Sequence, residues 1–170
     1  MNAEKKTKPV IAILASAYFI YYLFTYTDWH FIDSVNLIIH EAGHPLFMFF
    51  GTFMNILGGS LLQVLFPCLC VIYFYRRMEY FSASLLLFWV GQNIVNVSVY
   101  ASDALAMNLP LLGGDSVVHD WNALLNMTGL LGYTRVIGSG FWAIGVATIL
   151  CAIYFSLTNS FSKKSDTMSI

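Results

Sequence analysis

The spacing of charged residues constrains this chain more than any other feature of its sequence. Long apolar tracts separate a few short basic clusters, as expected if each cluster marks the end of a membrane-spanning segment. Only 10% of the residues are charged, whereas a soluble domain carries about 25% and needs them to cover its surface. The eight basic residues form four clusters: Lys5, Lys6 and Lys8; Arg76 and Arg77; Arg135; Lys163 and Lys164. We therefore expect an all-α polytopic membrane protein, one membrane-embedded domain over residues 1–170 with soluble tails at about 1–8 and 158–170.

The apolar tracts predict four to five membrane segments, because crossing a bilayer takes about 20 mostly apolar residues. A fifth tract, Phe31–Phe50, is interrupted by polar residues near its middle. If all five tracts crossed, Arg76 and Arg77 would face the side opposite the amino-terminal lysines, against the positive-inside rule. We therefore favour four spans with a kinked or re-entrant fifth segment, and five spans stay the alternative. The four uninterrupted tracts are Val10–Tyr26, Met54–Tyr75, Phe81–Tyr100 and Val136–Leu157.

The interrupted tract contains His40-Glu41-Ala42-Gly43-His44, which matches the pattern H-E-x-x-H. On a helix these two histidines lie one turn apart and face the same way, so both can bind one Zn²⁺ at about 2.0–2.1 Å. Glu41 lies beside them and can take a proton from a zinc-bound water. No basic residue in the five tracts could pair with Glu41, and a divalent cation is the simplest compensation. An inert polar cluster is the alternative.

Residues around this pattern predict close packing and a bend. Gly43 removes a side chain beside the histidines and would let another backbone approach, and the small residues 58–60 would let helices pack closely. Pro45 leaves the carbonyl of Glu41 without its helical donor, so we expect a kink there. Asp33 lies seven residues before His40, on the same helix face, and we expect it at the water boundary.

A catalytic zinc has three protein ligands and an open position for water, so a third ligand is needed. We favour His119, a good zinc ligand beside a carboxylate that could orient its ring. Polar residues also follow one face of the segment 81–100, which must then face the bundle interior. From that face we expect Asn93 and Asn96, with Gln92 as an alternative, to hold the backbone of a substrate or the oxyanion. The alternatives for the third ligand are Asp103, Asp120 and Asp115.

The stretch from Ile38 through His40–His44 to Phe47 resembles the site-2 protease type of intramembrane zinc metalloprotease. In that family the two histidines bind zinc and the glutamate activates water, which the resemblance implies for His40, His44 and Glu41. The family's third ligand is a downstream aspartate in a pattern close to N-x-x-P-x-x-x-L-D-G. Residues Asn108–Asp115 resemble that pattern in composition but not in spacing, so the likeness covers one strong short motif and one loose one.

These features together predict an integral-membrane zinc metallopeptidase that hydrolyses membrane-embedded or membrane-proximal peptides, with Zn²⁺ as cofactor. The alternatives are a metal-binding sensor or transporter without proteolytic activity and an accessory structural subunit. The net charge of −1 gives no electrostatic footprint for nucleic acid, so we expect none as a partner. We expect a multi-pass protein of the cell membrane, as in a bacterial inner membrane. We also consider a homodimer, because five segments are few to shield a wet metal site.

Overall fold

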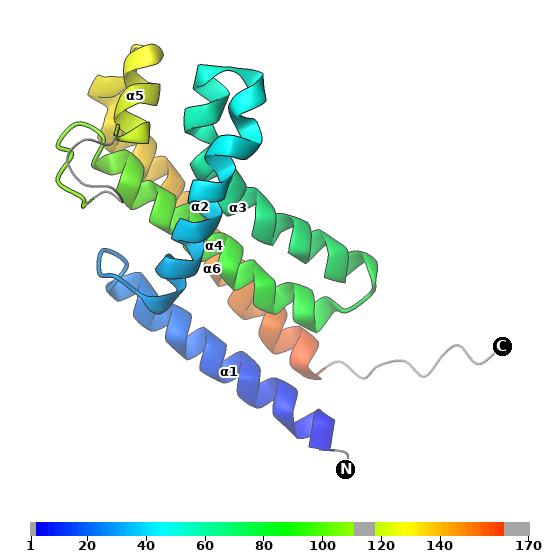
Figure 1. The fold of residues 1–170 in the computed structure, drawn as a ribbon. Coiled ribbons are helices and arrows are strands. Elements are labelled where there is room, and N and C mark those ends of the chain that lie inside the picture. The colour runs from blue at the N-terminus through cyan, green and yellow to red at the C-terminus, as the bar shows by residue number, and fades with distance from the viewer. Residues whose placement is uncertain (1–2, 111–117, 162–170) are drawn as a thin grey trace.

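The computed structural model describes residues 3–110 and 118–161, and its regular elements are all helical (Figure 1). No β-strand occurs in these two ranges, so the predicted all-α fold is confirmed. In chain order the elements are α1 (Ala3–Phe24), α2 (Phe31–Phe47), the 3-10 turn η1 (Met48–Phe50), α3 (Thr52–Arg76), α4 (Tyr80–Ser102), α5 (Asp120–Met127), the 3-10 turn η3 (Leu131–Tyr133) and α6 (Thr134–Phe161).

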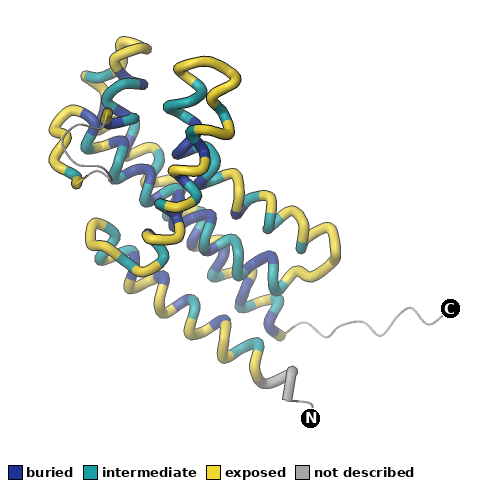
Figure 2. Tube along the Cα trace, in the orientation of Figure 1, coloured by how far each residue is buried: buried dark blue, intermediate teal, exposed yellow. Residues whose placement is uncertain are grey.

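Four helical segments are long and apolar enough to cross a membrane: Thr7–Phe24, Thr52–Arg76, Tyr80–Ser102 and Leu131–Phe161. The helix α4 is the most buried of them and packs against α6 on one side and α3 on another, with α1 against α6 (Figure 2). Large apolar side chains such as Leu14, Phe24 and Leu150 point outward instead. Such an outward apolar surface suits lipid, and the chain is a multi-pass membrane protein.

Both ends of the bundle can be identified from contacts between helices. The Lys8 ammonium at the start of α1 lies 5.8 Å from the centre of the Phe81 ring in α4. Near the end of α6, the side-chain amide of Asn159 donates to the backbone carbonyl of Tyr80 at 3.4 Å. The α3–α4 connection, which contains Arg77, lies at the same end. We call this the basic end (lower right in Figure 1).

The helix α2 does not cross the bundle. Since α1 leaves the basic end and α3 returns to it, α2 must begin and finish at the opposite end. It has only 17 residues, about 25 Å of helix, and it passes through Pro45 before giving way to η1 at Met48. Gly51, with φ 95°, then turns the chain into α3. This is the four-span arrangement with a re-entrant H-E-x-x-H segment.

Close approach of α2 and α3 depends on three glycines, as the sequence predicted. A Cβ on Gly43 would overlap the carbonyl oxygen of Gly58. A Cβ on Gly59 would overlap the imidazole of His40. The two backbones therefore touch, and His40 lies directly against α3.

Candidate metal centre

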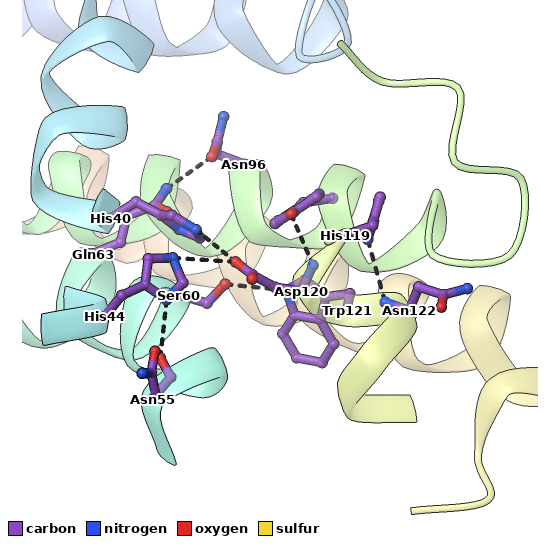
Figure 3. Close-up of polar contacts among 11 residues, drawn as sticks. His40, His44, Asn55, Ser60, Gln63, Asn96, His119, Asp120, Trp121 and Asn122 are labelled. Carbon is purple, nitrogen blue, oxygen red and sulfur yellow. Dashed lines mark hydrogen bonds and ion pairs between the residues drawn. The ribbon is translucent and has the colours of Figure 1, made fainter. Parts of the chain in front are cut away.

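Three potential ligands converge in the half of the bundle away from the basic end. His40 and His44 project from the same side of α2, toward the first residue of α5, Asp120 (Figure 3). The Oδ2 atom of Asp120 lies 2.9 Å from His40 Nε2 and 3.5 Å from His44 Nε2. One ligand atom from each residue lies within 4.8 Å of the other two.

The spacing of these atoms fits a divalent metal such as zinc. Bonds of 2.0–2.1 Å in a tetrahedron place two ligand atoms about 3.3 Å apart, and the two Asp120 distances of 2.9 and 3.5 Å lie on either side of that value. Two imidazoles and a carboxylate are also one of the ligand sets of catalytic zinc.

The other ring nitrogen of each histidine faces an oxygen atom. His44 Nδ1 donates to the backbone carbonyl of Asn55 at 2.9 Å, and His40 Nδ1 lies 3.2 Å from Oε1 of Gln63. Because these oxygens only accept, each ring donates from Nδ1 and turns its Nε2 toward Asp120, with His40 Nε2 at hydrogen-bonding distance from Oδ2. Metal-ligating histidines are held in this way. The two Nε2 atoms and the carboxylate oxygen therefore face one another, an arrangement that a bound cation would stabilise.

Asp120 is aimed at α2 by its neighbours at the start of α5. The Asp120 amide donates to the Tyr100 hydroxyl at 3.1 Å. The buried Trp121 indole donates to Ser60 Oγ in α3 at 3.1 Å, and the Asn122 side chain donates to the carbonyl of Ala104 at 2.8 Å. These bonds fix the rotation of α5 against α3 and α4.

His119, the favoured third ligand, does not join His40 and His44. It is the N-cap of α5, and its Nδ1 accepts from the Asn122 amide at 3.2 Å. Its buried Nε2 lies 3.4 Å from Asp103 Oδ2, without the alignment of a hydrogen bond. Burial lowers the pKa of His119, and the Asp103 carboxylate opposes that shift. Asp120, one of the alternatives, takes the position expected for His119.

Of the two remaining aspartate candidates the structure describes only Asp103, which does not reach the centre. Asp103 caps the turn that follows α4, where its carboxylate accepts from the amides of Asn108 and Leu109 at 3.0 and 2.9 Å. Asp115 lies outside the described residues. Tyr100, which the sequence did not single out for this site, is the residue that binds the Asp120 backbone.

A cavity of about 520 Å³ opens beside the three ligands. Its wall includes Glu41 and Tyr100 together with residues 26–29, which join α1 to α2. Glu41 is exposed and has no hydrogen bond or ion pair with any part of the chain that the structure describes. An unpaired carboxylate thus lies at the open side of the ligand group.

The two asparagines expected to hold substrate lie differently. Asn96 lines the cavity and accepts a hydrogen bond from Gln63 at 2.8 Å. Asn93 is fully buried, donates to the carbonyl of Trp89 within its own helix and is not on the cavity wall.

Comparison of the chain with protein-family models, with curated proteins and with solved structures finds no match. The chemistry of the site is therefore inferred from its own residues.

Proposed function

We propose that this multi-pass membrane protein is a zinc metallopeptidase of the site-2 protease type, which hydrolyses membrane-embedded or membrane-proximal peptides. The observation that supports this most is the convergence of His40, His44 and Asp120 beside the unpaired Glu41. The histidines and the glutamate come from one short motif, whereas the aspartate comes from a helix eighty residues further along the chain. A chance H-E-x-x-H match would not require a distant carboxylate at that point.

Each residue then has a defined part in hydrolysis. His40, His44 and Asp120 hold the metal, which when bound polarises a scissile carbonyl and lowers the pKa of water. Glu41 accepts the proton of the attacking water and returns it to the leaving amine. Asn96 remains the candidate for holding substrate backbone, since it lines the same cavity as the ligands.

The location of the site indicates the side from which a substrate arrives. The ligands lie away from the basic end of the bundle, which carries Lys8, Arg76 and Arg77 against the single Arg135 at the site end, and the more basic helix ends face the cytoplasm. We therefore place the cavity on the non-cytoplasmic side of the cell membrane, the periplasmic side if the protein belongs to a bacterial inner membrane. A peptide segment at that surface or in the outer leaflet would be the substrate.

The test uses full-length protein in proteoliposomes, with quenched fluorescent peptides that contain an apolar segment. Glu41→Gln should lower hydrolysis at least 100-fold, in the range that a general base contributes, while zinc content stays at the wild-type level. Glu79→Gln is the matched control, because Glu79 is exposed in the α3–α4 connection, far from the ligands. Zinc-dependent hydrolysis that survives in Glu41→Gln would contradict the proposal. Full zinc binding without hydrolysis by the wild type would favour a sensor or transporter.

A further inference from the structure

Asp33 is almost completely buried, at the wall of the cavity, and does not lie at the water boundary that the sequence had suggested. Only 4% of its surface is exposed, and no lysine or arginine in the described ranges contacts it. Instead its carboxylate accepts three hydrogen bonds. Oδ2 accepts from the His30 amide at 2.8 Å, and Oδ1 accepts from Gln92 Nε2 at 2.7 Å and Asn96 Nδ2 at 3.1 Å.

This carboxylate fixes the direction of a chain of hydrogen bonds that ends at a metal ligand. Because Asp33 only accepts, Asn96 must turn its NH₂ group toward it, and Asn96 Oδ1 is then left to accept from Gln63 Nε2 at 2.8 Å. Gln63 therefore turns Oε1 toward His40 Nδ1, 3.2 Å away. An amide oxygen accepts, so His40 carries its proton on Nδ1 and presents Nε2 toward Asp120.

A second branch reaches Asp33 with its direction fixed from the other end. The Trp89 indole can only donate, and it donates to Asn36 Oδ1 at 2.8 Å. Asn36 then donates to Gln92 Oε1 at 2.7 Å, and Gln92 donates to Asp33. Asn36 and Gln92 are almost completely buried, so reversing this branch would leave buried donors facing one another, which is costly.

We propose that Asp33 is a positioning residue for the metal centre, acting through Asn96 and Gln63 to hold the tautomer of His40 that binds metal. The inference rests on the proposed function, since it presupposes a metal at His40, His44 and Asp120. A metal-ligating histidine ordinarily donates its second N–H to a carboxylate or carbonyl, and loss of such a partner costs about 10–100-fold in metal affinity. Here the carboxylate lies two amide side chains away.

The test measures Zn²⁺ affinity of the purified full-length protein in micelles, by competition with a chromogenic chelator. Asp33→Leu keeps the branched shape of the side chain but removes every acceptor, and it should weaken binding about 10–100-fold. In the double variant Asp33→Leu/Gln63→Glu, the new carboxylate on α3 accepts directly from His40 Nδ1. We expect this variant to recover most of the lost affinity, because a carboxylate still holds the His40 ring and now does so directly, without the two amide side chains between them. Ser156→Ala, which removes another buried hydrogen bond far from the site, should bind as the wild type does.

Two results would overturn the inference: wild-type affinity in Asp33→Leu, or a loss that Gln63→Glu does not repair. The second would make Asp33 a structural residue of α2. If Asp33→Leu fails to fold, Asp33→Asn and Asp33→Asn/Gln63→Glu test the same link, because asparagine keeps the shape of the side chain but no longer fixes which way Asn96 and Gln63 turn, and the new glutamate should restore the lost affinity. A wild-type protein that binds no zinc would instead overturn the proposed function itself.

Discussion

His119 and Asp120 are adjacent in the sequence but have different roles at the start of α5. The His119 ring accepts the amide proton of Asn122 and so satisfies a free donor of the first helical turn. That bond occupies Nδ1 and turns the ring toward Asp103, away from His40. Asp120, one position later, is free to reach both histidines of α2.

Substitutions of His119 should therefore affect stability but not metal content. His119→Asn keeps an oxygen that can accept from the helix but loses the ring packed against Tyr100, so it should lower the thermal unfolding midpoint less than His119→Ala does. His119→Ala should lower the free energy of unfolding by about 1 kcal/mol for the lost cap, with a further loss for the packing of the ring against Tyr100. Unfolding monitored by tryptophan fluorescence measures the stability of the two variants, and zinc measured on the same samples gives their metal content. Zinc lost from a folded His119→Asn protein would identify His119 as a ligand.

Residue roles differ in how far the sequence can predict them. His40, Glu41 and His44 could be identified because helix geometry alone places i and i+4 on one face. The choice between His119 and Asp120 could not be made in that way, since adjacent helical residues point about 100° apart. The rotation of α5 is set by contacts with other helices, Trp121 to Ser60 among them. The expectation that Asp33 lies at the water boundary was wrong for the same reason, because two of the three donors to its carboxylate come from α4.

At the scale of the helices, the pairing of α2 with α3 brings the motif to its place. The three glycines at their crossing let His40 lie against α3, within reach of Gln63. The sequence indicated this contact through its small residues, and it indicated the re-entrant path of α2 through the basic clusters. It could not indicate how deeply α2 enters the bundle, because that depends on the fit of two backbones.

Gly59→Ala should displace the His40 ring without changing the motif itself. The added Cβ would overlap the imidazole, and overpacking of this kind costs about 1–3 kcal/mol. We expect a lower unfolding midpoint and at least about 10-fold weaker zinc binding, as for lost support of a ligand. Gly140→Ala in α6 is the matched control, since a Cβ there meets nothing within 4 Å. Equal zinc affinity in the two variants would contradict this role of Gly59.

The attachment of α5 to α3 can be tested through the Trp121 indole, which donates a hydrogen bond to Ser60. Trp121→Phe removes the hydrogen bond to Ser60 Oγ and should lower the free energy of unfolding by about 0.5–1.5 kcal/mol. It should also weaken zinc binding, because the bond helps to set the rotation of α5. Trp142→Phe changes a tryptophan of α6 that is 39% exposed and should leave zinc binding unchanged. Denaturant unfolding and chelator competition measure the two quantities, and an unaffected zinc affinity in Trp121→Phe would contradict the positioning role.

On the scale of the whole molecule, the basic end of the bundle and the site lie opposite one another. Lys8 and Arg77 lie at one end, and the cavity with its ligands opens at the other. The four spans were predictable because apolar tracts and basic clusters both reflect the bilayer. The convergence of α2, α3, α4 and α5 around one cavity was not, since it results from packing between helices distant in sequence.

Cysteine labelling in intact cells tests this orientation. The three native cysteines, Cys68, Cys70 and Cys151, are first replaced by serine. Asn126→Cys in α5 should then react with a membrane-impermeant maleimide from outside, whereas Glu79→Cys should react only after the membrane is permeabilised. The positive-inside rule gives this expectation. Labelling in the opposite sense would place the cavity on the cytoplasmic side.

The zinc content of purified protein, measured by mass spectrometry of the metal, tests most directly whether His40, His44 and Asp120 form a metal centre. We expect about one zinc per chain in the wild type, as one three-ligand site requires, and also in His119→Asn and Glu41→Gln. His40→Ala and Asp120→Ala should each lose it while remaining folded. Stoichiometric zinc in Asp120→Ala would contradict this ligand set, and a wild-type protein without metal, purified in the absence of chelators, would contradict the metal centre altogether.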